Sequence, residues 1–460
     1  MARRTLALPA RRGRRSLALI AATIATLLTI TGCTRPDDSG GASPSVEISD
    51  SPVGKRTQWA LDLINWDEEI IAYDLKGALD EGMLEAITLD ELAETLNAIR
   101  ANGPWTATDY SESGANATAI LESEAADPLQ LKLAVDDDGL IAGMLFSAAP
   151  AAREPSTTWD ELTAALKDLP APASFTVTQL TGADTAPVFV FGETGARPIG
   201  SMIKLWVLVA VVDAIERGAL TWSTPLTVTD DLRSLPSGEL QDEPTGTQVS
   251  VEDAALKMIS ISDNTAMDLL IAAVGRGAVE QTFIDVGNQD PGLNVPLLTS
   301  REAFQVGWSE NGTLRDGWSR GDDEVRRAVI EGLPGGTLNV EARDVTGPAW
   351  HLGIDWFATA QDLVQVHAAL ERRADTLAGA PIRQIMGENP GLPFGDEWSY
   401  VAFKGGSSPG VLGGSWLLER EDGERYVITV QVASTNPNEV ADYAPYFGPV
   451  QDAAAILASE

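Results

Sequence analysis

The chain has 460 residues, of which 44% are hydrophobic, and 67 acidic side chains outnumber 32 basic ones to give a net charge of -35. This length exceeds one ordinary core and predicts at least two folded domains. Because no basic block occurs beyond the first residues, the charge argues against nucleic acid as a partner and indicates a solvated acidic surface.

The N-terminal segment has the pattern of an export signal. Residues 1–16 carry six arginines and no acidic residue, and residues 17–31 are apolar and uncharged. Roughly 15 apolar residues are too few for a comfortable membrane span, so residues 1–32 predict a signal peptide, exported by the general or the twin-arginine route. Cys33, the only cysteine, directly follows Gly32. This position resembles the lipobox of bacterial lipoproteins, which implies a lipidated Cys33 at the extracytoplasmic face of the cell membrane.

A polar stretch follows the cysteine. Residues 33–54 are rich in Asp, Ser, Gly and Pro. Such a segment cannot bury enough apolar surface to fold alone, so it predicts a disordered tether between the membrane and the folded domains.

Residues 55–152 predict a first domain of the α+β class. Apolar spacing indicates a helix around Trp59, and the capping box of Thr88 and Glu91 begins another. Alternating stretches then predict an antiparallel meander at residues 105–111, 116–121, 129–135 and 140–146. The domain resembles the steroid-isomerase-like cone, in which a bent sheet wraps a helix. It contains no histidine or cysteine, and we assign it no chemistry.

Residues 157–460 predict the second domain, which begins with a helix at 157–169 and strands at 173–180 and 187–192. Ser201 and Lys204 then open an apolar run, so Ser201 is expected in the first turn of a buried helix, one turn from the lysine. A lysine kept neutral by burial can take the proton of a serine hydroxyl. The alternative is a serine that caps the helix and a solvated lysine.

Two further polar elements follow in this domain. A helix from residue 251 leads to Ser262, Asp263 and Asn264, which are either a helix cap or the edge of a cleft. A strand at residues 399–403 ends at Lys404-Gly405-Gly406-Ser407. The glycines allow a ligand to approach the backbone, and the alternative is a turn with an exposed lysine. Strands at 411–418 and 426–433 and a helix from about 439 complete the prediction.

The order Ser-x-x-Lys, Ser-Asp-Asn, Lys-x-Gly is the signature of penicillin-binding proteins and class A β-lactamases. Residues 157–460 resemble this serine hydrolase fold, which implies a five-stranded antiparallel sheet and a helical region. With the loop Ser234-Leu235-Pro236-Ser237-Gly238-Glu239-Leu240, the layout of the chain resembles the LpqF-type two-domain lipoproteins. It is also similar to a hydrolase of the clavulanic acid biosynthetic cluster.

This resemblance implies an acyl-enzyme mechanism. No histidine, cysteine or carboxylate cluster has metal-ligand spacing, so no metal cofactor is expected. The implied roles are Ser201 as nucleophile, Lys204 as base, Ser262 as proton relay, Asn264, Lys404, Gly406 and Ser407 as substrate-binding residues, and the Ser201 and Ser407 amides as oxyanion hole. The implied substrate is a small β-lactam, ester or peptidoglycan-derived compound. Alternatives are a D,D-carboxypeptidase and a non-catalytic binding protein of the cell envelope.

Two departures from the family pattern predict weak β-lactamase activity. Gly405 replaces the usual threonine, and Ser407 or Ser408 is the expected substitute for its hydroxyl. The glutamate motif that activates the deacylating water is missing, and Glu302 is the only nearby carboxylate. A Ser-His-Asp mechanism is not expected, because His367 has the spacing of a packed core histidine and His351 lies in a loop.

Overall fold

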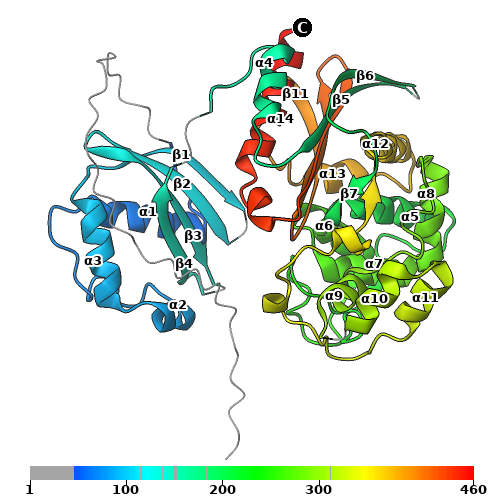
Figure 1. Ribbon diagram of the computed structural model, residues 1–460, viewed down its shortest axis with the longest axis horizontal. Helices are drawn as coiled ribbons and strands as arrows, with labels where there is room; N and C mark the ends of the chain where they lie inside the picture. The colour runs from blue at the N-terminus through cyan, green and yellow to red at the C-terminus, as the bar shows by residue number, and fades with distance from the viewer. Residues whose placement is uncertain (1–45, 114, 137, 150–152, 183, 311) are drawn as a thin grey trace, which may run out of the picture. The chain divides into compact units, whose positions relative to one another are not determined.

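The computed structural model describes residues 46–460 except 114, 137, 150–152, 183 and 311. These residues form two compact units that divide between Arg153 and Glu154 (Figure 1). The predicted signal peptide, Cys33 and the tether up to residue 45 lie outside the described residues. Within the part that the structure describes, no helix is long and apolar enough to cross a membrane.

The first unit consists of three helices followed by a four-stranded antiparallel sheet in the order β1-β2-β3-β4. The elements are α1 (Pro52–Ile64), α2 (Glu81–Ala86), α3 (Leu89–Arg100), β1 (Thr106–Ser113), β2 (Asn116–Ser123), β3 (Ala126–Val135) and β4 (Ile141–Ala148). The predicted meander and the capping box of Thr88 and Glu91 are confirmed. The helix α2 was not predicted. Leu96, Leu121 and Leu131 are fully buried between helices and sheet.

Residues 46–54, which belong to the predicted tether, have a described structure. The helix α1 starts at Pro52, where the side chain of Ser51 accepts a hydrogen bond from the Gly54 amide. The Val46 amide donates to the carbonyl of Ala107 at 3.0 Å. Serine is a favourable N-cap and proline a favourable first helical residue, which explains why the helix begins inside this polar stretch.

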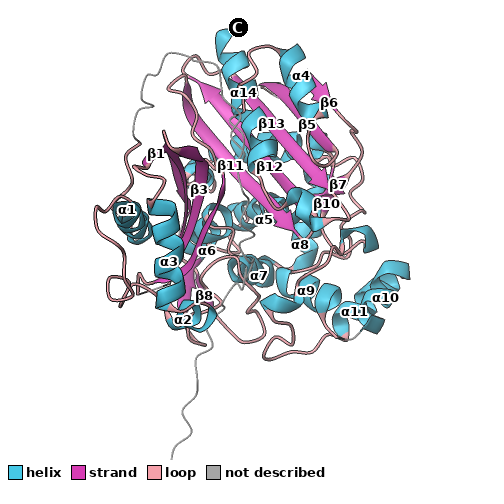
Figure 2. Ribbon diagram, turned by 60° about the vertical axis from the view of Figure 1, so that its left-hand side comes forward, coloured by secondary structure: helices cyan, strands magenta, loops and turns pink. Residues whose placement is uncertain are grey.

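The second unit contains the predicted five-stranded antiparallel sheet, in the order β11-β12-β13-β5-β6 (Figure 2). Its strands are β5 (Ala173–Thr181), β6 (Asp184–Phe191), β11 (Trp398–Ser408), β12 (Val411–Arg420) and β13 (Arg425–Ala433). The strand β11 lies at one edge of this sheet. Two short pairs, β7 (Arg197–Pro198) with β10 (Phe357–Ala358) and β8 (Pro225–Thr227) with β9 (Gln248–Ser250), were not predicted.

Helices cover both faces of this sheet (Figure 2). The helices α4 (Trp159–Lys167) and α14 (Ala444–Ser459) pack on one face together with Phe175, Trp416 and Ile428. The helices α5 (Lys204–Glu216), α12 (Ala360–Ala374) and α13 (Ile382–Gly387) pack on the other, against Ala402, Leu417 and Val427. Alternating strand residues therefore serve two separate cores.

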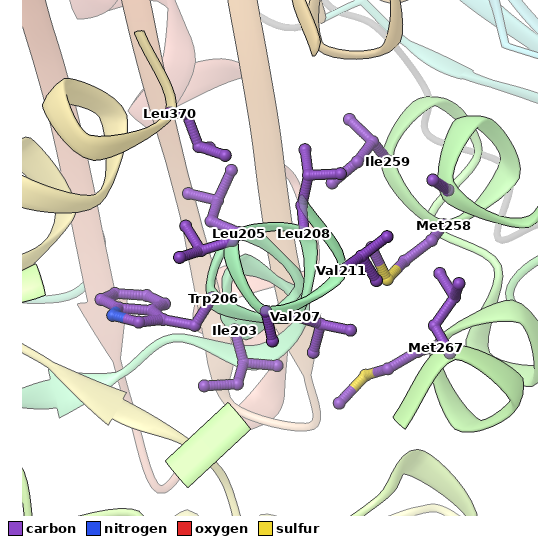
Figure 3. Close-up of a cluster of buried hydrophobic side chains, with 14 of the residues drawn as sticks. Ile203, Leu205, Trp206, Val207, Leu208, Val211, Met258, Ile259, Met267 and Leu370 are labelled. Carbon is purple, nitrogen blue, oxygen red and sulfur yellow. The ribbon is translucent and has the colours of Figure 1, made fainter. Parts of the chain in front are cut away.

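The helix α5 is the centre of the helical region. Apolar side chains point away from this helix in all directions (Figure 3), and Trp206 is completely buried; its polar residues are Lys204, Asp213 and Glu216. A helix that is hydrophobic on all sides must be surrounded by other elements. These include α6 (Val251–Ser260), α7 (Asn264–Val274) and α8 (Arg276–Val286).

A smaller insert extends the helical region. It contains α9 (Ser300–Trp308), α10 (Gly312–Arg320), α11 (Asp323–Glu331) and the 3-10 turns η2 (Ala342–Asp344) and η3 (Trp350–Leu352). Val306, Trp318 and Ile354 belong to its own small core. These helices were not predicted, because α10 and α11 are polar overall and Trp318 is the one side chain that they bury. The 3-10 turn η4 (Pro437–Val440) precedes α14.

Candidate active site

Ser201 lies at the point where the chain enters the buried helix α5. It belongs to a 3-10 turn, η1 (Gly200–Ile203), that leads directly into the helix at Lys204. The sequence predicted Ser201 in the first turn of the α-helix itself; it lies instead in the 3-10 turn that precedes the helix. The N-cap position is Ile199 and makes no side-chain capping bond. Ser201 is thus not the helix cap, and its hydroxyl is 3.1 Å from the Lys204 amine.

The Lys204 amine is completely buried and lies among four oxygen atoms. It is 2.6 Å from the Ser262 carbonyl, 2.7 Å from Asn264 Oδ1, and 3.1 Å from both the Ser201 and the Ser262 hydroxyl. The carbonyl and the amide oxygen can only accept. In a neutral amine these two take both N–H donors, so the lone pair is left for a hydroxyl. The geometry therefore lets Lys204 accept a proton from Ser201 or Ser262.

Burial lowers the pKa of Lys204 well below its ordinary value of 10.5, and the positive charge of Lys404 lowers it further. The carboxylates of Asp263 and Asp268 act in the opposite direction. Since burial is the largest effect, the neutral amine is favoured. A solvated lysine, the alternative prediction, is excluded.

Ser262 occupies the sharp connection between α6 and α7. Its φ of 58° is in the left-handed region, which an L-residue adopts only at a cost. The neighbouring Asp263 holds this connection in place. Its carboxylate caps α7 through the Ala266 amide and accepts the amides of Glu239 and Leu240 at 2.8 and 2.9 Å. The loop at residues 234–240 is therefore fixed to the Ser-Asp-Asn element.

Asn264 supports the lysine in this structure. Its Oδ1 accepts from Lys204, and its Nδ2 donates to the carbonyl of Leu235 at 3.1 Å. Because the Leu235 carbonyl can only accept, it fixes which end of the amide faces Lys204. Both ends of the side chain are bonded within the protein, and the expected contact of Asn264 with a substrate stays a prediction.

Lys404 is buried within β11, with 3% of its surface exposed. Its amine is 3.0 Å from the Ser262 hydroxyl and 2.9 Å from the carbonyl of Gly405. Burial lowers its pKa from 10.5 to about 7. A turn with an exposed lysine is therefore excluded. The Ser262 hydroxyl lies between the two amines, which gives an unbroken polar path from Ser201 through Lys204 and Ser262 to Lys404.

Two glycines let the nucleophile turn and the edge strand approach closely. A methyl group on Gly406 would overlap the carbonyl of Ile199 and lie 2.9 Å from the amide nitrogen of Ser201. A methyl group on Gly200, whose φ is 50°, would lie 2.8 Å from the amide nitrogen of Ser407. The amides of Ser201 and Ser407 thus belong to two segments in direct contact, as the predicted oxyanion hole requires.

Sequence reasoning missed Asp355, which has no recognisable pattern around it. Its buried carboxylate accepts the Gly200 amide and the Ser408 hydroxyl, both at 2.8 Å. Ser408 was one of two candidates to replace the hydroxyl that is missing at Gly405. It is already bonded to Asp355, so this expectation is not supported for Ser408.

Glu302 is a structural residue at the start of α9. Its side chain forms a capping box with Thr299 and a bidentate ion pair with Arg276 at 2.6 and 2.9 Å. These contacts occupy both carboxylate oxygens, which argues against the role of a deacylating base.

His367 is the predicted core histidine: it is buried, its Nε2 lies 3.0 Å from the Ser415 hydroxyl, and burial lowers its pKa to about 4.

Replacing Glu302 with glutamine is expected to leave acylation and release of a bound acyl group within about threefold of the wild-type rates. The same change should lower the free energy of unfolding by about 1 to 2 kcal/mol, because a helix cap and a partly buried ion pair are weakened. Urea denaturation and the rate of acyl release measure the two effects. A loss of acyl release by a factor of a hundred would restore Glu302 as the deacylating base.

Comparison with known proteins gives the family of the chain. A family model described as "Beta-lactamase enzyme family" matches residues 157–444, and one described as "ORF 12 gene product N-terminal" matches residues 48–141. No curated protein matches the chain.

Solved structures with similarity to the chain have low sequence identity. They are PBP-A (19% identity, TM-score 0.44, 67% of this chain and 96% of that chain covered), a β-lactamase from Sphaerobacter thermophilus (19%, 0.46, 66% and 96%) and a class A β-lactamase from Bacteroides cellulosilyticus (19%, 0.47, 67% and 100%). The first family model, however, covers well over half of the residues. The chain belongs to the Beta-lactamase enzyme family of serine hydrolases.

Proposed function

We propose that this serine hydrolase forms an acyl-enzyme on Ser201 with β-lactams or activated esters and releases the acyl group slowly. The observation that carries the proposal is the row of hydrogen-bonded groups Ser201, Lys204, Ser262 and Lys404 in one buried cluster. The Lys204 amine is fully buried, and burial lowers its pKa, which favours the neutral form that can accept a proton.

In the proposed acylation, the Ser201 oxygen attacks the substrate carbonyl while its proton moves to Lys204. The amides of Ser201 and Ser407 stabilise the negative charge on the carbonyl oxygen, which is worth on the order of 10²- to 10³-fold in rate for each donor. The carbonyl carbon then loses its bond to the leaving nitrogen or oxygen. That atom receives the proton from Lys204 through the Ser262 hydroxyl, so the lysine ends the step neutral again.

Slow release of the acyl group follows from the positions of the carboxylates described above. Hydrolysis of the ester needs a base beside the attacking water. Glu302 is occupied by the cap of α9 and by Arg276, and Asp263 is occupied by the backbone amides of Glu239, Leu240 and Ala266. We therefore infer that acylation outpaces deacylation, which makes the protein a weak β-lactamase.

Intact-mass spectrometry tests this proposal. Incubation with a panel of penicillins, cephalosporins and activated esters is expected to add the mass of one acyl group, which persists for minutes or longer. The Ser201→Ala variant should show no adduct. If the folded wild type acquires no adduct from any of these compounds, the active-hydrolase proposal fails and a non-catalytic binding role takes its place.

A D,D-carboxypeptidase is the second candidate, and the position of β11 favours it. This strand lies at the edge of its sheet and carries Lys404. An extended peptide can bind such an edge by adding a strand, with its terminal carboxylate near the lysine. Release of D-alanine from a muropeptide pentapeptide separates this activity from simple esterase or β-lactamase activity.

The pH dependence distinguishes anionic from neutral substrates. For a compound with a carboxylate, the second-order acylation rate constant is expected to fall as the pH rises above about 7, where Lys404 loses its proton and its attraction for the carboxylate. A neutral ester needs only the neutral Lys204, so its rate constant should rise with pH to a plateau. In Lys404→Met, the falling limb should vanish. Identical profiles for both compounds would contradict a carboxylate site at Lys404.

We further propose a membrane-anchored lipoprotein whose first domain is a steroid-isomerase-like cone of the LpqF or clavulanic-cluster type. The residues before and at Cys33 support the anchor, and the order of three helices and a meander supports the cone. Expression in a bacterial host with labelled palmitate is expected to label the wild type but not Cys33→Ala. Labelling of both proteins, or of neither, would contradict a lipidated Cys33.

A further inference from the structure

The carboxylate of Asp355 connects the two segments that carry the proposed oxyanion hole. Its Oδ1 accepts the amide of Gly200 at 2.8 Å, directly before Ser201. Its Oδ2 accepts the hydroxyl of Ser408 at 2.8 Å, directly after Ser407. One side chain is therefore bonded to the neighbour of each proposed oxyanion donor.

The alternation of β11 explains why Ser408 reaches this carboxylate. Residues two apart on a strand share a face, so Lys404, Gly406 and Ser408 face the same side. Each has a separate contact there. Lys404 reaches Ser262, the missing side chain of Gly406 makes room for the turn η1, and Ser408 reaches Asp355. Ser408, the last residue of β11, therefore bonds to Asp355 just beyond the place where the strand packs against the nucleophile turn.

Asp355 is itself held firmly. It is buried with 8% of its surface exposed, and the amide of Trp356 also donates to its Oδ1 at 2.8 Å. The next residues continue the attachment to the nucleophile segment, since the Ile199 amide donates to the carbonyl of Trp356 at 2.8 Å and Phe357 pairs with Pro198. A short, well-anchored link of this kind can fix a spacing between two segments.

We propose that Asp355 is a positioning residue that clamps the nucleophile turn to the end of β11 and so sets the spacing of the two oxyanion donors. This inference rests on the proposed acyl-transfer function. Asp355 touches neither the reacting atoms nor Lys204, and its effect passes through Gly200 and Ser408. The proposed role depends on two hydrogen bonds and not on a negative charge. An asparagine at position 355 is therefore expected to retain most of the acylation rate. Its Oδ1 accepts the Gly200 amide, and its Nδ2 donates to the Ser408 oxygen.

Three variants of the full chain test the clamp, Asp355→Ala, Asp355→Asn and Ser408→Ala, with Ser399→Ala as the control. Ser399 lies on the same strand, is exposed, and bonds only to the Glu419 carbonyl. The first measurement is hydrogen exchange by mass spectrometry on peptides that cover residues 197–203 and 404–410. The second is the acylation rate constant, separated from the dissociation constant of the non-covalent complex. The third is the infrared carbonyl frequency of the acyl-enzyme.

Loss of the clamp is expected to act on both segments at once. In Ser408→Ala, exchange should accelerate in the peptide containing Gly200, to which Ser408 is linked through the carboxylate of Asp355. Ser408→Ala and Asp355→Ala should acylate at least about tenfold more slowly with little change in non-covalent affinity, and their acyl carbonyl should absorb at a higher frequency, as weaker hydrogen bonding requires. Asp355→Asn should remain within about threefold of the wild type, and Ser399→Ala should be unchanged.

Other results overturn the inference. If Ser408→Ala acylates at the wild-type rate, or if exchange accelerates only in the segment that carries the substitution, Asp355 does not act as a clamp. If Asp355→Asn acylates as slowly as Asp355→Ala, the negative charge of Asp355 is required, and its two hydrogen bonds do not explain the effect. Should Asp355→Ala fail to fold, the results for Ser408→Ala and Asp355→Asn still test whether Asp355 clamps the two segments. If the wild type forms no acyl-enzyme, the proposed function fails, while the exchange measurement still tests the clamp.

Discussion

The Lys204→Met variant is expected to acylate at least about a thousandfold more slowly than the wild type, with its fold retained. Methionine matches the length of lysine and keeps the packing of its apolar stem, while the base is lost. The Ser262 carbonyl and Asn264 Oδ1 lose a donor, which is expected to cost about 1 to 3 kcal/mol in stability. General-base catalysis contributes about 10²- to 10⁴-fold, and groups that act as a unit fail together. Stopped-flow labelling with a fluorescent penicillin measures the rate, and circular dichroism checks the fold.

The same variant has a second, thermodynamic signature. The pKa of Lys204 is lowered in the folded state, so between that pKa and 10.5 the unfolded chain binds more protons than the folded one. Stability therefore rises with pH across this range in the wild type, and burying the amine costs most at low pH. In Lys204→Met this contribution to the pH dependence should be absent. Urea denaturation at several pH values measures it.

The exposed Lys167 near the end of α4 provides the control. Lys167→Met should leave the acylation rate unchanged, since the Lys167 side chain is exposed on α4. If Lys204→Met acylates within tenfold of the wild type, a different group takes the proton of Ser201. In that case the neutral-lysine mechanism is wrong, whatever the pH dependence of stability.

The Gly406→Ala variant is expected to lose about a hundredfold or more in acylation rate. The added methyl group would overlap the Ile199 carbonyl and press on the amide of Ser201, so the nucleophile turn and β11 must move apart. Displacing one oxyanion donor costs on the order of 10²- to 10³-fold. Overpacking of this kind also costs about 1 to 3 kcal/mol in stability. Labelling kinetics and urea denaturation measure the two effects.

Gly195 offers a matched control for this substitution. A methyl group there has no atom within 4 Å, and the backbone does not require glycine, so Gly195→Ala should match the wild type in both measurements. A Gly406→Ala protein that is destabilised but acylates at the wild-type rate would show that the close approach serves packing alone. A protein with normal stability and slow acylation would place the effect in the oxyanion hole.

Local patterns in the sequence were sufficient for most of the fold. Alternating residues predicted the meander β1 to β4, because each strand buries one face against helices. The apolar run after Lys204 predicted a central helix and a buried amine, since a helix with apolar residues on all sides is surrounded by other elements. The insert from α9 to η3 escaped prediction because its small core draws single residues from several short segments.

The site was predictable only in part. The spacing of Ser201 and Lys204 indicated one contact, and the order of three motifs indicated that distant residues converge, but no local rule brings Lys404 to Ser262 across 142 positions. The role of Asp355 could not be predicted from the sequence for the same reason. Its partners are 155 and 53 positions away, and a single aspartate in a bend carries no period or spacing. Long-range contacts made by isolated side chains need the fold itself.

The backbone of Ser262 shows what the fold gives up for this site. With φ at 58°, the residue forgoes about 1 to 2 kcal/mol that an extended or right-handed conformation would not lose. A glycine would relieve the strain but would carry no hydroxyl between the amines of Lys204 and Lys404. The protein is therefore held slightly below the greatest stability its architecture allows, in return for one oxygen atom at the meeting point of two lysines.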